Sequence, residues 1–256
     1  MSSAESPAPD GPTLARAATE NSEPTKVVII TGASRGIGAG LVAAFRRAGY
    51  AVVATSLSMD PADDPQIAAV SGDITEAQTA QRVIACALER FGRIDSLINN
   101  AGIFIGKPFT DYTIEDFTAI TSVNLAGFFH ITQGVIPQML DQRGGHVVNI
   151  STSLVEHADA TRPAALAVLT KGGLAAVTRS LAIEYASRAV RFNAVSLGVI
   201  RTPVYDAASY AGNEALHPLG RVGEISDVAA GILYLERATF VTGETLHIDG
   251  GQVAGH

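Results

Sequence analysis

Short apolar segments alternate along the chain with longer segments that mix alanine, leucine and charged residues. We interpret the short segments as strands, because they are rich in β-branched residues and apolar at nearly every position, as in strands covered on both faces. These segments span 26–31, 51–56, 96–101, 146–151, 191–197 and 245–249. The longer segments, which we predict to be helices, span 39–49, 76–92, 114–140, 164–188 and 224–235.

This alternation predicts the fold class. Strand–helix–strand order produces parallel strand pairs joined by right-handed crossovers, which place helices on both faces of the sheet. We therefore expect an α/β protein with a single Rossmann-like domain over 26–256, a doubly wound parallel sheet of about seven strands flanked by helices. A length of 256 residues, 47% of them hydrophobic, is enough for one domain of this kind.

The first 25 residues have a different composition, rich in serine, alanine, proline and acidic residues. They lack the basic start and apolar stretch of a secretory signal, so we predict a disordered tail over 1–25. No uninterrupted apolar run reaches the ~18 residues that a membrane span needs. The sequence therefore predicts a cytoplasmic protein without a membrane partner.

Charge and cysteine content narrow the range of partners. The 18 basic and 25 acidic residues give a formal net charge of -7 without any basic block, which disfavours a nucleic-acid partner and favours a small-molecule substrate. Cys86 is the only cysteine, and the six histidines show no HExxH spacing. We therefore predict no metal site.

The first predicted strand leads directly into the segment TGASRGIG at 31–38, which contains Gly32, Gly36 and Gly38. Glycines at such a strand-to-helix turn let the backbone turn sharply and approach a pyrophosphate. The N-terminus of the following helix favours an anion because its N–H groups are free and its dipole is positive there. This segment predicts a dinucleotide site.

Further motifs follow in a characteristic order: Asp73 in GDIT, NNAG at 99–102, Asn124 in VNLAG, VVNIS at 147–151, Lys171, RTP at 201–203 and TGETLHIDGG at 242–251. With this order and spacing, the chain after residue 25 resembles the short-chain dehydrogenase/reductase family. The resemblance implies that the glycine segment holds the cofactor pyrophosphate, that Asp73 contacts the adenine, and that Thr202 lies near the nicotinamide carboxamide. It also implies a homotetramer or homodimer, formed by the long helices 115–140 and 164–187.

The candidate cofactor-binding residues follow from the glycine segment and from this resemblance. They are Gly32, Ser34, Arg35, Gly36, Ile37, Gly38, Ser56, Asp73, Ile74, Asn100, Ala101, Gly102, Lys171 and Thr202.

The choice of nicotinamide cofactor depends on the end of the second predicted strand. Folds that prefer NAD usually carry an acid about 20 residues after the glycines, where it holds the ribose 2′-hydroxyl. Ser56 and Leu57 occupy that place, so no carboxylate repels a 2′-phosphate, and Arg35 adds a positive charge nearby. A second base common in the family would fall at Leu57 and is absent. The sequence favours NADP(H) over NAD(H).

The resemblance implies catalysis by serine, tyrosine and lysine, with an asparagine that maintains a water-linked proton path; Asn124 matches that asparagine. The tyrosine lies four residues before the lysine, on the same helix face. Lys171 fixes the register, and Ala167 occupies the tyrosine position. The sequence contains no tyrosine between Ser151 and Lys171, so a local shift of the alignment cannot restore it.

The position of the serine is ambiguous. Counting forward from Asn149 places it at Thr152, whereas counting backward from Ala167 places it at Leu154. The segment thus carries about two extra residues, and Ser151, Thr152 and Ser153 are rival hydroxyls. We favour Thr152 and then Ser153.

Three explanations for Ala167 remain open. Another side chain could supply the proton: Glu156, His157 and Asp159 follow the hydroxyl cluster, and Tyr205 and Tyr210 follow RTP. His157 is the preferred one, because its ordinary pKa is near neutral pH. Alternatively, water or the Lys171 ammonium could suffice, at a cost of typically 10²–10⁴-fold in rate. In the third explanation the protein binds a nucleotide without redox turnover, or catalyses a non-redox, isomerase- or lyase-like reaction.

From these alternatives we favour an NAD(P)(H)-dependent oxidoreductase that acts on a carbonyl or alcohol substrate through an atypical site. The candidate catalytic residues are Lys171, Asn124, Thr152, Ser153 and His157.

Overall fold

A seven-stranded parallel sheet forms the centre of the molecule, in the order β3-β2-β1-β4-β5-β6-β9. The computed structural model describes residues 24–203, 210 and 212–255. From β1 the chain builds outward through β2 to β3 and then crosses back to place β4 on the other side of β1. The predicted fold class, a doubly wound parallel sheet of about seven strands, is confirmed. The strands are β1 Val27–Thr31, β2 Ala51–Ser56, β3 Ile67–Ser71, β4 Ser96–Asn99, β5 Gly145–Thr152, β6 Val190–Leu197 and β9 Thr245–Ile248.

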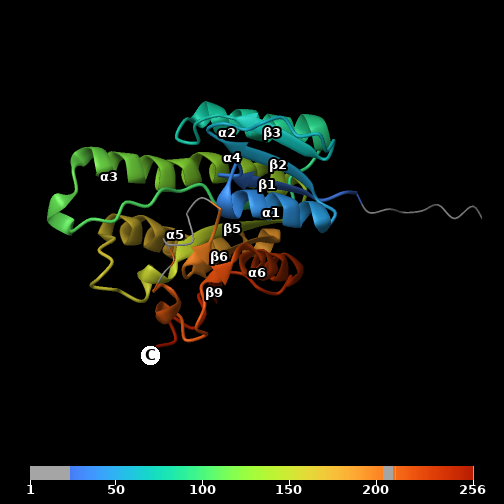
Figure 1. Cartoon of the computed structure of the whole chain (residues 1–256). Helices are drawn as coiled ribbons and strands as arrows, with labels where there is room; N and C mark the ends of the chain where they lie inside the picture. Colours follow the sequence, from blue (N-terminus) through green and yellow to red (C-terminus); the bar gives the residue numbers. More distant parts are fainter. Residues whose placement is uncertain (1–23, 204–209, 211, 256) are drawn as a thin grey trace, which may run out of the picture.

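Helices cover both faces of this sheet. One face is covered by α1 (Gly36–Arg47) and α6 (Ile225–Arg237), which lie side by side although they are far apart in the sequence (Figure 1). The other face is covered by α2 (Ala77–Phe91), α4 (Gly127–Asp141) and α5 (Ala165–Tyr185). The tail predicted over 1–25 falls almost wholly outside the described residues.

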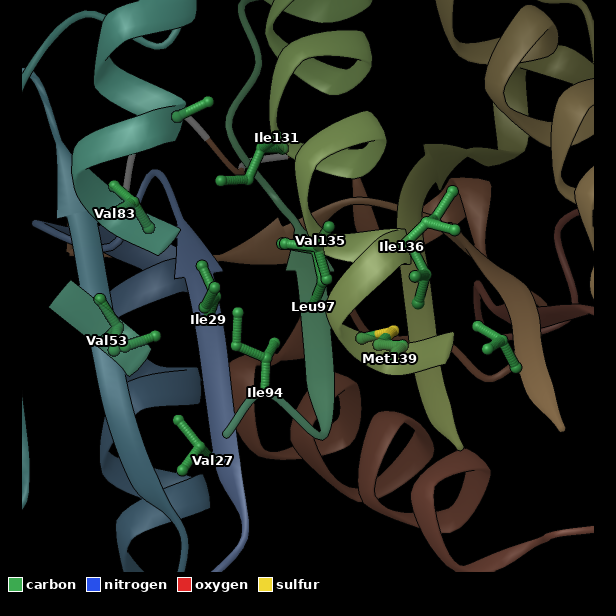
Figure 2. Close-up of a cluster of buried hydrophobic side chains, with 14 of the residues drawn as sticks. Val27, Ile29, Val53, Val83, Ile94, Leu97, Ile131, Val135, Ile136 and Met139 are labelled. Carbon is green, nitrogen blue, oxygen red and sulfur yellow. The ribbon is translucent and has the colours of Figure 1, made fainter. Parts of the chain in front are cut away.

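The strands are apolar at successive positions because both faces are buried. Along β1, Val27 and Ile29 point toward α2 and α4, whereas Val28 and Ile30 belong to the core beneath α1 and α6. Figure 2 shows the first of these cores, in which side chains of α2 and α4 meet those of β1, β2 and β4. The side chains labelled there are Val27, Ile29, Val53, Val83, Ile94, Leu97, Ile131, Val135, Ile136 and Met139.

The strand segments read from the sequence omitted β3, which has the sequence IAAVS. This strand lies at the sheet edge, pairs only with β2, and is mostly half-buried. Its two alanines weaken the β-branched signal that marks the other strands. Two further short strands, β7 (Ile200–Arg201) and β8 (Gly223–Glu224), form a separate parallel pair.

The helix predicted over 114–140 is interrupted. It begins as α3 (Ile114–Thr121), passes through a π-helical turn at Ser122–Ala126, and continues as α4. Asn124 lies at the centre of this turn, a type of bulge that is frequent at functional sites. Single-turn 3₁₀ segments lie at Phe109–Asp111, Ser153–Val155, Ala186–Arg188 and Glu214–Leu216.

Two helical stretches, Ile114–Asp141 and Ala165–Arg188, are long and apolar enough to cross a membrane when judged by length and composition. This is weak evidence, because the core helices of soluble proteins pass the same test. Here α4 and α5 cover one face of the sheet, and part of each stretch is buried there. The described residues contain no group of three or more histidine, cysteine, aspartate and glutamate side chains placed to hold a metal ion.

A buried polar network joins the end of α6 to the start of β5. Glu236 lies 2.7 Å from His146 Nδ1 and accepts a 2.7 Å hydrogen bond from Ser96. Burial favours a higher pKa for Glu236, but His146, Ser96 and Arg191 outweigh it, so the net pKa is lowered. A carboxylate whose pKa is lowered by folding stabilises the fold at pH values above its unfolded pKa of about 4.3. This stabilisation is lost as pH falls through the pKa of the folded state.

We therefore predict that Glu236→Gln makes the thermal stability of the protein less sensitive to acidic pH. Between pH 5 and pH 3 the melting temperature of the native protein should fall further than that of the variant, measured by circular dichroism. Glu89→Gln, on the exposed side of α2, is the matched control and should follow the native curve. Parallel native and Glu236→Gln curves would show that Glu236 is not ionised in the fold.

Candidate cofactor and active site

A cavity of 490 Å³ lies at the carboxyl ends of the central strands. In open α/β sheets, ligands bind in the crevice outside these ends, where the strand order reverses. All fourteen candidate cofactor residues line this one cavity, and Thr152 lines it with them. The remaining lining residues are Thr31, Thr55, Leu57, Gly72, Ile103, Phe104, Val123, Ile150 and Ala167.

The glycine loop is built for a close backbone approach. Gly32 and Gly36 have φ values of +66° and +57°, which favour glycine. A Cβ atom at Gly38 would lie 2.1 Å from the carbonyl oxygen of Gly32, so only glycine fits there. Helix α1 starts at Gly36 without a side-chain cap or an acidic residue in its first turn. Its first N–H groups therefore have no side-chain cap, and Gly36, Ile37 and Gly38 of this turn line the cavity, as a bound pyrophosphate requires.

Hydrogen bonds between strand ends hold this loop in place. Asn100 Nδ2 donates to the carbonyl oxygens of Thr31 and Gly32 at 2.9 and 3.1 Å, and Thr31 Oγ1 accepts from Ala101 N at 2.9 Å. The Ser34 and Ser56 hydroxyls lie 3.0 Å apart and join the loop to the end of β2. The NNAG segment thus supports the glycine loop by direct contact.

At the opposite end of the cavity, α5 brings Lys171 to the end of β5. Its Nζ donates a 2.8 Å hydrogen bond to the carbonyl oxygen of Ile150. Burial lowers the pKa of Lys171 to about 8. Thr152, two residues after Ile150, lines the same wall, and its Oγ1 accepts a long 3.4 Å bond from Leu154 N. Its hydroxyl proton is therefore available to a ligand oxygen.

Three other candidate catalytic residues do not line the cavity. Asn124 is buried, and its amide is bonded to the backbone of Ile103 and to Thr170 Oγ1. The Ser153 hydroxyl is buried and donates to Gln252 Oε1 at 2.8 Å. His157 lies on the turn beyond Ser153, to whose carbonyl oxygen its N–H donates at 2.8 Å. Of the three rival hydroxyls, the structure places only Thr152 on the cavity wall.

A family model described as "Enoyl-(Acyl carrier protein) reductase" matches residues 32–252. The chain belongs to the short-chain dehydrogenase/reductase family. Among curated relatives, the 3-oxoacyl-(acyl-carrier-protein) reductase FabG of Thermotoga maritima is 35% identical over 89% of this chain and 98% of its own length. The 3beta-hydroxysteroid dehydrogenase 1 of Eggerthella lenta is 33% identical over 88% of this chain and 93% of its own length.

Solved structures show the same similarity. The 3-ketoacyl-(acyl-carrier-protein) reductase of Brucella melitensis, complexed with NADH, has a TM-score of 0.83 with 28% identity and covers 90% of this chain and 99% of its own. ElxO with NADP bound has a TM-score of 0.83 and 28% sequence identity, and the match covers 90% of this chain and 100% of ElxO. Both nicotinamide dinucleotides therefore occur among the short-chain dehydrogenase/reductase structures that this chain resembles.

Ala167 lies one helical turn before Lys171 and lines the cavity, but it is only 2% exposed. Its methyl group belongs to a small apolar cluster with Ile120, Ala164 and Leu166, against which Tyr112 and Leu154 pack. The hydroxyl of Tyr112 donates to the carbonyl oxygen of Ile105 at 2.7 Å. Sequence spacing did not indicate this cluster, since its members come from four separate segments.

The alternative proton sources after the hydroxyl cluster and after RTP have other partners. Glu156 lies 3.0 Å from His247 Nε2, and Asp159 accepts from Thr161 N at 2.8 Å. The Tyr210 hydroxyl contacts Thr202, accepting from its N–H at 2.9 Å. Tyr210 therefore supports the segment that carries Thr202. Tyr205 lies outside the described residues.

Proposed function

We propose that this protein is an NADP(H)-preferring oxidoreductase that interconverts a carbonyl and an alcohol through an atypical site. One observation carries the proposal: the glycine loop, the adenine-side Asp73, Thr202 and Lys171 all line one continuous cavity together with the Thr152 hydroxyl. A folded remnant without a ligand would not require this combination. At Gly32 and Gly38 a Cβ atom would meet Asn100 or the backbone of neighbouring segments, so these glycines allow the tight strand-to-helix turn that fits a dinucleotide.

Each end of the cavity has a separate task. The first turn of α1 would hold the pyrophosphate, and Lys171 would bind the nicotinamide ribose. The nicotinamide, when bound, accepts or supplies a hydride. Thr152 would orient the substrate oxygen by a hydrogen bond. Asn124 joins the backbone of Ile103 to α5 through its bonds to Ile103 and Thr170.

Preference for NADP(H) is supported by charge at the end of β2. Ser56 and the exposed Leu57 replace the acid that would bind a 2′-hydroxyl, and the exposed Arg35 lies on the neighbouring loop. A guanidinium recognises a phosphate by charge-assisted hydrogen bonds. Because NADH and NADP complexes both occur among the similar structures, the preference rests on these three residues.

Arg35→Ala should weaken NADPH binding selectively. We expect the dissociation constant to rise roughly fivefold for NADPH, as for an exposed ion pair worth ~1 kcal/mol, and to change less than twofold for NADH. Fluorescence titration at low ionic strength measures both, and added salt should reduce the difference. Equal weakening of both cofactors would assign Arg35 to the structure of the loop instead.

The substrate that fits best is a small or medium, partly apolar carbonyl compound. Ile103, Phe104 and Val123 line the cavity together with Ala167, so part of its wall is apolar. Phe104 is 60% exposed, which gives an apolar rim at the entrance. Apolar walls with few polar groups are typical of small-molecule sites.

The experiment that tests the function is separate titration with NADPH and NADH, followed by assays on a panel of aldehydes, ketones and 3-oxoacyl thioesters. We expect tighter NADPH binding and oxidation of NADPH with at least one carbonyl compound. Tight NADPH binding without any turnover would favour a nucleotide-binding protein, and consumption of a substrate without cofactor oxidation would favour a non-redox catalyst.

We also propose a cytoplasmic homotetramer or homodimer. Large apolar side chains remain exposed on the outer surfaces of α3, α4 and α5, namely Ile114, Phe117, Phe129, Leu169 and Ile183. Exposed apolar surface of this kind often marks a subunit contact. Sedimentation at micromolar concentration should give a dimer or tetramer, whereas a monomer would refute the assembly.

A further inference from the structure

Reduction of a carbonyl requires a proton at oxygen as well as a hydride at carbon. One helical turn before Lys171 the chain carries Ala167, which cannot donate a proton. Water or another group on the cavity wall must supply the proton if the proposed function, on which this inference rests, holds. The position of each titratable side chain decides which group that is.

Among the described residues that line the cavity, the charged side chains are Arg35, Asp73 and Lys171. Asp73 follows β3, which is four strands from β5, so it lies about 19 Å from Thr152 at a strand spacing of ~4.8 Å. Its Oδ1 also accepts a 2.9 Å hydrogen bond from Thr75 N. Arg35 lies at the glycine loop, and a guanidinium does not give up its proton in proteins. Among the described lining residues, Lys171 alone is both at the Thr152 end and able to titrate near neutral pH.

The immediate surroundings of Lys171 leave its ammonium accessible to a substrate. One of its three N–H donors is used by the carbonyl oxygen of Ile150. A Cβ atom at Gly102 would lie 3.0 Å from Nζ and 3.1 Å from Asn124 Oδ1, so glycine keeps this side open. Ala167, on the same face of α5, adds only a methyl group. Two donors therefore remain, one for the cofactor ribose and one for a substrate oxygen.

We propose that Lys171 is itself the general acid of this enzyme. As the hydride of NADPH adds to the carbonyl carbon, the C=O π electrons move to oxygen, and that oxygen takes a proton from the Lys171 ammonium. The products are the alcohol, NADP⁺ and a neutral Lys171 amine. The amine regains its proton from water after the alcohol leaves. Thr152 donates a hydrogen bond to the same oxygen throughout.

The electrostatics of the site suit this role. The contacts of Nζ are uncharged: it bonds to the carbonyl oxygen of Ile150, and a Cβ atom at Gly102 would lie between it and the neutral amide of Asn124. Desolvation alone lowers the pKa of Lys171, to about 8. A general acid works best with a pKa near the working pH. The ammonium form is required for reduction, so kcat should be constant near pH 7 and should fall as pH rises above about 8.

Lysine is rare in this chain, which makes a direct test practical: Lys26, Lys107 and Lys171 are the three lysines. Protein labelled with ¹³C at lysine Cε should give three signals, assigned by the Lys26→Arg, Lys107→Arg and Lys171→Arg variants. The Lys171 signal should titrate near pH 8 in the free protein, without any turnover being required. A Lys171 midpoint at or above 10 would overturn the proposal.

Chemical rescue distinguishes proton donation from positive charge. At saturating NADPH, Lys171→Ala should lower kcat by roughly 10²–10⁴-fold. Ethylammonium should restore part of this rate, whereas tetramethylammonium, which is charged but has no N–H, should not. The Lys171→Arg variant should bind NADPH with an affinity within a few-fold of the native value. It should still show the loss of kcat. Rescue by both cations, or normal turnover in Lys171→Arg, overturns the role of Lys171.

Different results would overturn the role of Lys171 and the oxidoreductase activity. Native protein that binds NADPH but reduces no compound of the panel overturns both. Native turnover that survives Lys171→Arg, or that shows no decline above pH 8, overturns only the assignment of Lys171. Lys107→Arg, in an ion pair with Asp116 away from the cavity lining, is the matched control and should retain native kcat and pH dependence.

Discussion

Gly38→Ala should weaken binding of NADPH and NADH alike by about 10²-fold or more. The new Cβ atom would lie 2.1 Å from the Gly32 carbonyl oxygen and 2.8 Å from Asn100 Nδ2. Because a Cβ atom is fixed to the backbone, no rotamer change can relieve this contact, and the loop or α1 must move. Shifts of about 1 Å in a positioning element can cost 10²-fold in reaction rate, and we expect a loss of that order in cofactor affinity here. Overpacking of this kind also costs roughly 1–3 kcal/mol in the free energy of unfolding.

Gly144→Ala is the matched control. Gly144 precedes β5 at the opposite end of the sheet, and a Cβ atom there would contact only the carbonyl oxygen of Ala189, at 3.7 Å. Its cofactor affinity should equal that of the native protein in isothermal titration calorimetry. Native affinity in Gly38→Ala as well would show that the cofactor does not approach the backbone at this loop.

The fold was predictable because its central strands are buried on both faces. β1 and β2 are almost wholly buried, and their sequences are apolar at every position before the terminal Thr31, Thr55 and Ser56; the glycine loop fixes where the first strand ends. β3 was missed because an edge strand is under weaker constraint and keeps residues such as Ala68 and Ala69. The π-helical turn at Asn124 was also missed: Asn124 bonds there to Ile103 and Thr170, both distant in sequence, and local patterning does not reveal such contacts.

The candidate site also has a part that could be predicted from the sequence, the cofactor residues, and a part that could not, the catalytic residues. The cofactor residues follow strand ends, and strand order alone brings the ends of parallel strands to one edge. The catalytic candidates depend on the path of one loop, because Ser153 starts a 3₁₀ turn that directs its hydroxyl to Gln252, 99 residues later. No local pattern reveals such a partner. His157 was favoured for its ordinary pKa, but proximity to the cavity requires the three-dimensional path of that turn.

Two side chains would have to change to rebuild the tyrosine that the family resemblance implies. Ala167 is 2% exposed, and Leu154 and Tyr112 pack against its cluster, so we expect a phenol ring there to require that Leu154 be made smaller. Leu154 is also the position that backward counting assigns to the family serine. We therefore expect Ala167→Tyr alone to lose roughly 1–3 kcal/mol of stability by overpacking. The double variant Leu154→Ser with Ala167→Tyr should recover much of that loss.

This double variant should reduce its carbonyl substrate about tenfold faster than the native protein at pH 9. There, one pH unit above a pKa of about 8, only about one-tenth of Lys171 remains protonated, whereas a tyrosine with an ordinary pKa of about 10 keeps its proton. At pH 7 both acids are available, so the two rates should lie much closer together. Stopped-flow measurement of NADPH oxidation across pH 6–10 checks both statements. Leu154→Ser with Ala167→Phe provides the ring without the proton and should keep the native decline above pH 8. If the tyrosine and phenylalanine variants share one pH profile, no proton passes through position 167, and the space beside Lys171 serves the substrate instead.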